Sequence, residues 1–178
     1  SEFRGCENLK YVTAANPSLK ITGGEVDTSY TFDSFKEDVP AEFYLESVDS
    51  SQFHTCATNN YMAFSYLNSD GTKQNLYELT VQETSGKKAV YRVNSSNQLV
   101  YCEFDSGLET VTMPDTVGPY QITVIGSGIF RNNCYLRRIT IPSSITTIED
   151  SAFKGCHNLK DVIFKEPVNV TSIGTDAF

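Results

Sequence analysis

The segment Ile148-Glu-Asp-Ser-Ala-Phe153 decides the fold, because the chain contains it in two further versions. These are Ile125-Gly-Ser-Gly-Ile-Phe130 and Ile173-Gly-Thr-Asp-Ala-Phe178, so the three phenylalanines lie 23 and 25 residues apart. A second phrase also recurs, first as Leu136-Arg-Arg-Ile139-Thr-Ile141-Pro142 and then as Leu159-Lys-Asp-Val162-Ile-Phe164. A fixed period in the twenties predicts a solenoid of small stacked units, none of which can bury its apolar face alone.

Each unit is expected to contain one short strand at the second phrase. Side chains alternate along a strand, so Ile139 and Ile141 are predicted to point inward and Thr140 outward. Pro142 ends this strand, because proline has no N–H to donate to a sheet. The next turn is then expected to place Phe153 in the core.

Stacking places like residues above one another, so the core is predicted to consist of columns of equivalent positions. Leu136 is expected above Leu159, and replacing one member of the phenylalanine column by alanine is expected to cost about 3–5 kcal/mol. The predicted structural core of the repeats consists of Cys6, Leu9, Val12, Phe130, Leu136, Ile139, Ile141, Phe153, Cys156, Leu159, Val162 and Phe178.

The same phrase is present at the start of the chain. The stretch from Phe3 to Val12 has the residue offsets of the stretch from Phe153 to Val162. Residues 1–32 are therefore interpreted as the end of a first repeat array. Because the sequence opens and closes inside a repeat, the chain is interpreted as a piece of a longer protein.

The repeat signal is lost between the two arrays. Residues 33–70 indicate a cap-like unit that consists of a strand, a short amphipathic helix over 51–60 and a second strand. Residues 71–106 alternate between apolar and polar and predict a β-hairpin or meander. Residues 107–178 form the second array, in which 118–121 is interpreted as a surface-loop insertion.

The repeat unit resembles the BspA-like (Treponema-type) leucine-rich repeat of bacterial surface proteins. The resemblance rests on Ala152-Phe153-Lys-Gly-Cys156-His-Asn-Leu159 and the strand that follows. The sequence departs from the family pattern at Asn133, which takes the cysteine position, and at Lys165, where proline would be expected. The resemblance implies a β-rich or α+β fold, a right-handed leucine-rich-repeat solenoid interrupted by the cap-like strand-helix-strand unit and the β-meander.

Composition and motifs favour a binding module without a cofactor. The net charge of −8 disfavours a nucleic-acid interface, and no apolar stretch approaches the roughly 18 residues that a membrane span needs. The chain has no Cys-x-x-Cys motif for zinc. Ser85-Gly-Lys-Lys88 matches a catalytic Ser-x-x-Lys pattern but falls in a predicted hairpin turn. We therefore expect no metal, no cofactor and no enzyme activity.

The five cysteines include two at the same repeat offset, Cys6 and Cys156. That position faces the predicted core, where a free cysteine behaves as a small apolar residue. Both thiols are expected to be reduced and buried. Because an exposed apolar column needs a covering unit, contact between chains, or further repeats in the parent protein, is also expected at the array ends Phe3 and Phe178.

The resemblance implies adhesion to host, matrix or neighbouring cells through a protein or glycan ligand, for a secreted or cell-surface protein of a gut or oral bacterium or a parasitic protist. A structural spacer and an accessory domain of a larger surface enzyme are the alternatives. The sequence also predicts where a partner would bind, on residues that point outward between the inward positions of the strands. Thr110, Arg138 and Asp161 form one such row, and Thr112, Thr140 and Ile163 form the next.

Overall fold

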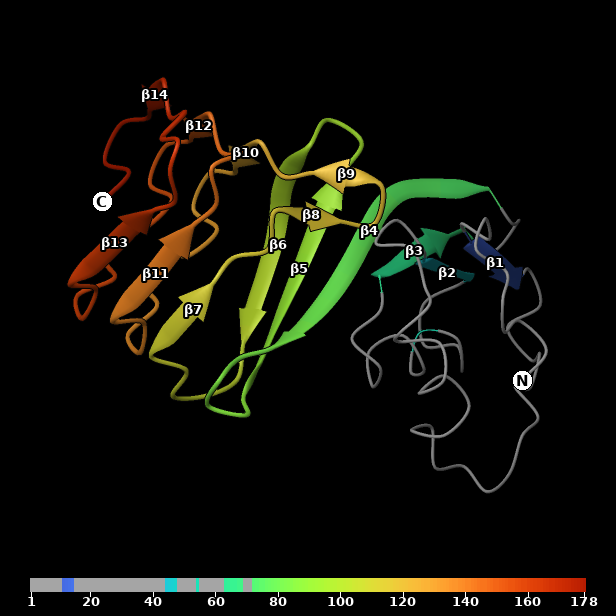
Figure 1. Ribbon diagram of the computed structural model, residues 1–178, viewed down its shortest axis with the longest axis horizontal. Coiled ribbons are helices and arrows are strands. Elements are labelled where there is room, and N and C mark those ends of the chain that lie inside the picture. The colour runs from blue at the N-terminus through green and yellow to red at the C-terminus, as the bar shows by residue number, and fades with distance from the viewer. Residues whose placement is uncertain (1–10, 15–43, 48–53, 55–62, 69–71) are drawn as a thin grey trace. The chain divides into compact units, whose positions relative to one another are not determined.

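The computed structural model describes residues 11–14, 44–47, 54, 63–68 and 72–178 (Figure 1). The chain forms two compact units, Ser1–Thr80 and Val81–Phe178. The predicted core positions Cys6 and Leu9 lie outside the described residues, and Val12 lies in the first strand.

The first unit contains three parallel strands, β1 (Tyr11–Ala14), β2 (Tyr44–Ser47) and β3 (Ala63–Leu67), in that order. The strand β4 (Lys73–Gln82) begins in this unit and pairs antiparallel with β3. The strands β2 and β3 confirm the two strands that the sequence predicts around the helix. Of the predicted helix, only His54 belongs to the described residues, so the structure does not support the strand-helix-strand cap.

The second unit contains an antiparallel hairpin of β5 (Lys88–Asn94) and β6 (Gln98–Phe104), where the sequence predicts two strands. The predicted alternation is present in β5, whose side chains are alternately buried and partly buried. The register shifts between Arg92 and Val93, which pair with Tyr101 and Leu99, so Val100 is an extra residue of β6. This bulge changes the alternation, because Leu99 is buried while both Val100 and Tyr101 are exposed.

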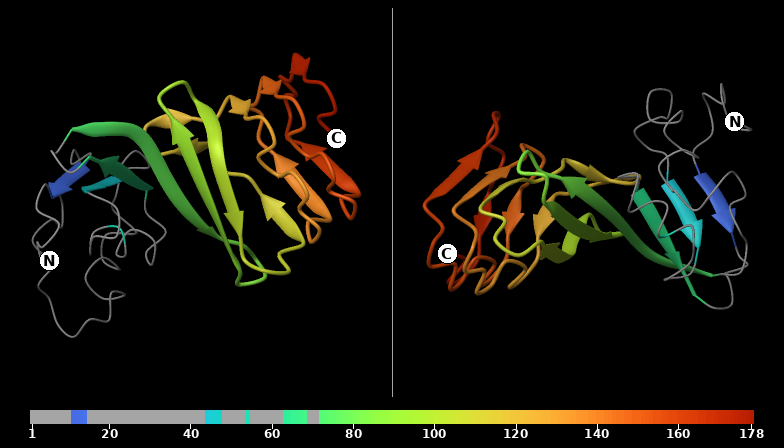
Figure 2. Two further views of the ribbon diagram at one scale, coloured as in Figure 1. Left: turned by 180° about the vertical axis from the view of Figure 1, so that it is seen from behind. Right: turned by 90° about the horizontal axis from the view of Figure 1, so that it is seen from below.

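The rest of the second unit is a β-solenoid of about three turns. Each turn contributes one strand to a parallel sheet in the order β13 (Asp161–Phe164), β11 (Arg138–Ile141) and β7 (Thr110–Thr112). Short strands on the other side, β10 (Val124–Ile125), β12 (Thr147–Ile148) and β14 (Ser172–Ile173), continue in parallel from β6. Figure 2 shows β7, β11 and β13, in yellow to red, side by side from behind.

The predicted surface-loop insertion is instead a small hairpin. The strands β8 (Thr116–Val117) and β9 (Tyr120–Gln121) pair antiparallel around Gly118 and Pro119. Val117 and Gly118 are buried, so this segment closes part of the core. Gly118 has a φ of 57°, a conformation that favours glycine in a two-residue turn.

The solenoid core consists of stacked columns, as the sequence predicts. Leu99, Ile125 and Ile148 are fully buried and adjacent in register across β6, β10 and β12. The rings of Phe104, Phe130, Phe153 and Phe178 are stacked with centroid separations of 5.7, 4.7 and 5.0 Å.

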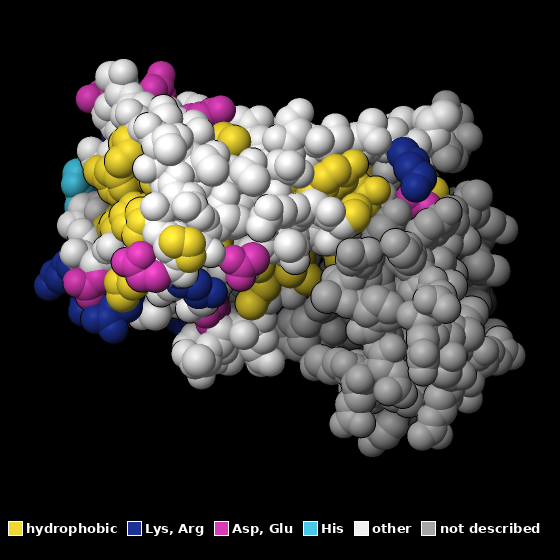
Figure 3. Space-filling model, turned by 45° about the horizontal axis from the view of Figure 1, so that its top comes forward, with side chains coloured by type: hydrophobic (Ala, Val, Ile, Leu, Met, Phe, Trp, Pro, Cys, Tyr) yellow, Lys and Arg dark blue, Asp and Glu magenta, His cyan; other side chains and the backbone are white. Residues whose placement is uncertain are grey.

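Burial decreases toward the last turn. Phe130, Leu136, Ile139, Ile141 and Phe153 are at most 2% exposed, which confirms their core assignment. Cys156, Leu159 and Val162 are only partly buried and Phe178 is 55% exposed, so the prediction of a buried core position is wrong for these four. The reason is that β13 and β14 are edge strands among the described residues, and no further described turn covers them. Apolar side chains gather over this end, at the left of Figure 3.

A buried carboxyl group covers the other edge of the three-stranded sheet. Glu83 is 8% exposed, and its Oε1 accepts a hydrogen bond of 3.1 Å from the N–H of Thr112 in β7. Burial raises the pKa of the Glu83 carboxyl, and the hydrogen bond from Thr112 acts in the opposite direction. The Thr112 N–H is therefore already used by a side chain of the same unit.

Candidate binding face

The six residues predicted to form a binding face lie in two rows across β7, β11 and β13. Arg138 is aligned with Thr110 on one side and with Asp161 on the other. Thr140 is aligned in the same way with Thr112 and Ile163. The buried residues Val111 and Ile139 alternate with these rows on β7 and β11. The structure thus brings all six residues together on the outward side of one sheet.

The first row contains an ion pair. The Arg138 guanidinium donates from Nε and Nη2 to Oδ2 of Asp161, at 3.0 and 2.7 Å. Both side chains are about half exposed, and such surface pairs contribute about 0.2–1 kcal/mol. A partner that uses Arg138 therefore has to compete with Asp161 or contact both side chains together.

The second row carries no charge. Thr112 and Ile163 are exposed and Thr140 is partly exposed, and Ile163 is a large apolar side chain that is 44% exposed. A strip of two hydroxyl groups and one branched apolar side chain presents both hydrogen-bonding groups and apolar area to a partner. The ion pair of the candidate face lies in the first row, so a partner can contact the second row without breaking it.

Further ion pairs join successive turns on the surface of the solenoid. Arg137 pairs with Glu109 at 3.4 Å, and Lys154 pairs with Asp176 at 2.7 Å. Hydrogen bonding and attraction by Lys154 lower the pKa of the Asp176 carboxyl. Each of these pairs joins a positive and a negative side chain from neighbouring turns.

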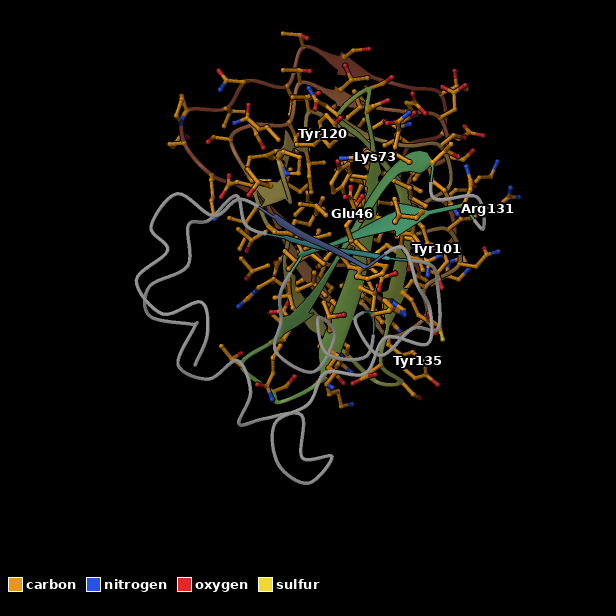
Figure 4. All side chains as sticks on the ribbon, turned by 90° about the vertical axis from the view of Figure 1, so that its right-hand side faces the viewer. Glu46, Lys73, Tyr101, Tyr120, Arg131 and Tyr135 are labelled. Atoms are coloured by element: carbon orange, nitrogen blue, oxygen red, sulfur yellow. The ribbon has the colours of Figure 1, made fainter. Side chains whose placement is uncertain are left out.

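A pocket of about 390 Å³ lies elsewhere in the second unit and was not predicted. It is lined by the end of β6, the turn after it and the turn before β11. Leu108, Phe104 and Phe130 supply buried or partly buried apolar walls, and Arg131 and Tyr135 are exposed. Figure 4 shows Arg131 and Tyr135 on the same side of the view.

The first unit contains a buried polar cluster that sequence reasoning also missed. Tyr66 donates its hydroxyl to Oε2 of Glu78 at 2.6 Å, and Nε2 of His54 lies 2.8 Å from Oε1 of Glu78. Nearby in the same unit, Lys73 pairs at 2.8 Å with Glu46, which is 1% exposed (Figure 4). Alternation along β4 placed Glu78 on the solvent side, and no local signal shows that His54 and Tyr66 cover it.

The described residues show no cluster of chemical groups typical of a metal centre. No group of three or more His, Cys, Asp and Glu residues in this part of the chain could hold a metal ion. His157 is exposed, and Ser85 and Gly86 form the turn between β4 and β5. The residues described also form no helix long and apolar enough to cross a membrane.

The three cysteines that the structure describes are free and differ in their environment. Cys134 is exposed, whereas Cys156 is partly buried and its thiol donates to the carbonyl oxygen of Phe130 at 2.9 Å. Burial raises the pKa of the Cys156 thiol and raises that of Cys102 well above its usual value. Because the thiolate is the reactive form, these two thiols should react slowly in the folded protein.

We therefore expect Cys134 to react with a disulfide reagent at pH 8 at least about tenfold faster than Cys102 or Cys156. Peptide mapping by mass spectrometry after short labelling times measures each thiol separately. In denaturant the three rates should become equal, which controls for intrinsic differences. Rapid labelling of Cys156 in the native protein would contradict the environment described here.

The part of the chain that contains the repeats also matches a known protein family. Residues 92–178 match the family model described as the BspA type leucine-rich repeat region, in six copies. No curated protein sequence matches the chain.

Several solved structures are similar to part of the chain. A leucine-rich cell surface protein from Faecalibacterium prausnitzii is 28% identical, with 56% of this chain and 27% of that chain covered and a TM-score of 0.43. A leucine-rich repeat protein from Bacteroides capillosus is 27% identical, with 56% and 73% covered and a TM-score of 0.42. A leucine-rich repeat protein from T. pallidum is 20% identical, with 47% and 38% covered and a TM-score of 0.39.

The matched part of the chain thus spans only about a quarter of the length of the F. prausnitzii protein. The family match covers the hairpin strand β6 and the whole solenoid with its phenylalanine column. The segment 92–178 of this chain consists of BspA-type leucine-rich repeats.

Proposed function

We propose that the chain is a non-enzymatic protein-binding module of an extracellular or cell-surface protein, and that it adheres to neighbouring cells through the β7–β11–β13 face. The observation that carries the proposal is the uncharged row of Thr112, Thr140 and Ile163, which is aligned across three strands and open to solvent. Stacked strands of this kind form the extended surfaces that repeat proteins use for recognition.

The geometry of the sheet supports a role in contact rather than in chemistry. The outward side chains are threonines, one isoleucine and an arginine that is paired with aspartate. Three strands give a small surface, so a single copy is expected to bind weakly. Many copies on a bead or a cell would bind more strongly through multivalency.

The test compares two double variants of the chain on coated beads. Thr140→Lys with Ile163→Lys places two charges on the proposed face, and we expect bead adhesion to cultured epithelial cells to fall at least about tenfold, because two lysines must be desolvated in any contact. Thr171→Lys with Ile173→Lys makes the same chemical changes near β14, where both residues are also exposed, and should leave adhesion unchanged. Circular dichroism checks that both variants remain folded.

Equal adhesion of the two variants and the wild type would exclude this face as the site. Wild-type beads that adhere no better than uncoated beads would favour a structural spacer instead. Treating the cells with protease or with glycosidase before the assay distinguishes a protein ligand from a glycan ligand.

A further inference from the structure

In the segment that carries the phenylalanine column, hydrogen bonds join each turn of the solenoid to the turn after it. The N–H groups of Phe130 and Asn132 donate to the carbonyl oxygens of Ala152 and Lys154, both at 2.8 Å. In the next turn, the N–H groups of Ser151 and Phe153 donate in the same way to Thr175 and Ala177, at 2.9 and 2.6 Å. In this segment each turn thus presents N–H groups to the turn after it and carbonyl oxygens to the turn before it. Elsewhere the direction is reversed, since the N–H groups of Glu149 and Gly174 donate to Ile125 and Ile148 of the preceding turn.

This pattern stops at the first turn. The repeat offset of 23 residues makes Ile129 and Arg131 equivalent to Ala152 and Lys154. No residue that the structure describes donates a hydrogen bond to the carbonyl oxygen of Ile129 or of Arg131. The reason is local: the preceding element is β6 followed by a short turn at Asp105–Gly107, and not a repeat turn with N–H groups to donate.

The pocket of about 390 Å³ lies where the missing turn would be. Asp105 and Ser106 line it on the side of β6, and Ile129, Arg131 and Tyr135 line it on the side of the first turn. Phe104 stacks on Phe130 and so covers the end of the phenylalanine column. The series of backbone hydrogen bonds beside the column has no such covering residue, because the carbonyl oxygens of Ile129 and Arg131 receive no donor from the described residues. The pocket therefore combines apolar walls with two backbone acceptors that the fold does not use.

The rim of the pocket carries a positive charge. Arg131 is exposed, and no carboxylate of the described residues pairs with it, although most surface arginines of the solenoid are paired. Asp105, which also lines the pocket, already accepts a hydrogen bond of 2.7 Å from the N–H of Lys88. An arriving acidic group would find in Arg131 a guanidinium with all its donors available.

We propose that this pocket is a second binding site, which takes an extended peptide segment of a partner protein with an acidic side chain placed at Arg131. The acceptors on Ile129 and Arg131 are two residues apart, and in an extended peptide the N–H groups on one edge are also two residues apart. Addition of such a segment would restore the missing hydrogen bonds by β-augmentation. The site does not depend on the β7–β11–β13 face.

The periodicity of the acceptors favours a peptide over a glycan, because sugar hydroxyl groups do not repeat with the spacing of peptide N–H groups. The probe is a capped heptapeptide in which valine and threonine alternate around a central aspartate. We expect it to bind with a Kd of about 1 mM or tighter and to shift the amide resonances of Ile129–Asn133 in NMR titrations. It should also slow alkylation of Cys134, which lines the same pocket.

N-methylated forms of the peptide test the hydrogen bonds directly. Methyl groups on the N–H groups of one edge should weaken binding about tenfold or more, while methyl groups on the other edge should change it less than twofold, since only one edge faces the carbonyls. Replacing aspartate by asparagine should weaken binding about threefold to tenfold. Equal binding of both methylated forms, or no binding of the parent peptide at about 10 mM, would overturn the proposal.

Two matched pairs of protein variants complete the experiment. Ser106→Tyr fills the pocket and should abolish binding, whereas Ser96→Tyr makes the same change in another exposed turn and should not. Arg131→Gln should remove the preference for aspartate over asparagine, and Lys160→Gln, which removes an exposed charge outside the pocket, should keep it. A cello-oligosaccharide that binds at Ile129–Asn133 while the peptide does not would replace the peptide site by a glycan site.

Discussion

Phe153→Ala is expected to lower the free energy of unfolding of the solenoid by about 3–5 kcal/mol. Phe153 is 1% exposed and its ring lies between those of Phe130 and Phe178, at 4.7 and 5.0 Å. Removing it leaves a cavity in the middle of the column and breaks two aromatic stacks at once. The loss of buried apolar area and the cavity act in the same direction.

Phe178→Ala is the matched control, because it changes the same residue type in the same column. Phe178 is 55% exposed and stacks on one side only, so its loss should cost about 1 kcal/mol. Unfolding in urea, monitored by hydrogen exchange at the amides of Ile139 and Ile148, reports on the solenoid alone. Equal costs for the two variants would show that the column doesn't carry the stability of the stack.

The second large effect is a loss of stability at alkaline pH. Tyr91 is fully buried, its hydroxyl has no hydrogen-bond partner among the described residues, and burial raises its pKa well above the usual value. Burial also raises the pKa of the neighbouring Cys102 thiol, and the negative charges of Cys102 and Glu83 add to the shift of Tyr91. Both groups are therefore held in the neutral form by the folded state.

The sign follows from the direction of these shifts. The stabilising contribution is fully present below the unfolded-state pKa, and it is lost as pH rises from there toward the folded-state pKa, because the unfolded chain releases protons first. Above about pH 10, the titration of Tyr91 alone should lower the free energy of unfolding by about 1.4 kcal/mol for each further unit of pH. The free energy of unfolding at pH 7 should be unaffected by either titration.

Tyr91→Phe should remove most of this alkaline loss. At pH 7 the variant should be as stable as the wild type or more stable, because it deletes a buried hydroxyl without a partner. Tyr135→Phe is the control, since Tyr135 is 49% exposed and should not change the pH dependence. The urea midpoint of each variant is measured at pH 7 and at about pH 10.5. An equal decrease of the midpoint for Tyr91→Phe and the wild type would exclude Tyr91 as the cause.

The register of the repeats could be predicted from the sequence, because two constraints act on the same residues. The offset between units aligns Arg138 with Asp161, and the alternation along a strand decides that Ile139 points inward. A shift of one residue would turn the isoleucines of β11 to solvent, so the hydrophobic pattern allows one register only.

Burial at the last turn could not be predicted in the same way. Val162 and Phe178 have the sequence signature of Ile139 and Phe153, but their exposure depends on what lies beyond them and not on their own unit. The pocket also has no local signal, because it results from hydrogen bonds that β6 does not supply to Ile129 and Arg131. The contact between His54 and Glu78 joins residues 24 positions apart and depends on the pairing of β3 with β4.

The hydrogen bond from Thr112 to Glu83 makes the two edges of the three-stranded sheet differ in how readily they can pair with another strand. An arriving strand at the β7 edge would have to displace a buried carboxylate from the Thr112 N–H and leave it without its donor. At the β13 edge it would meet no such competitor among the described residues, and the exposed Ile163 adds apolar area there. Side-by-side association of these sheets should therefore start at β13, and two β7 edges should not join, which disfavours symmetric edge-to-edge pairing through β7.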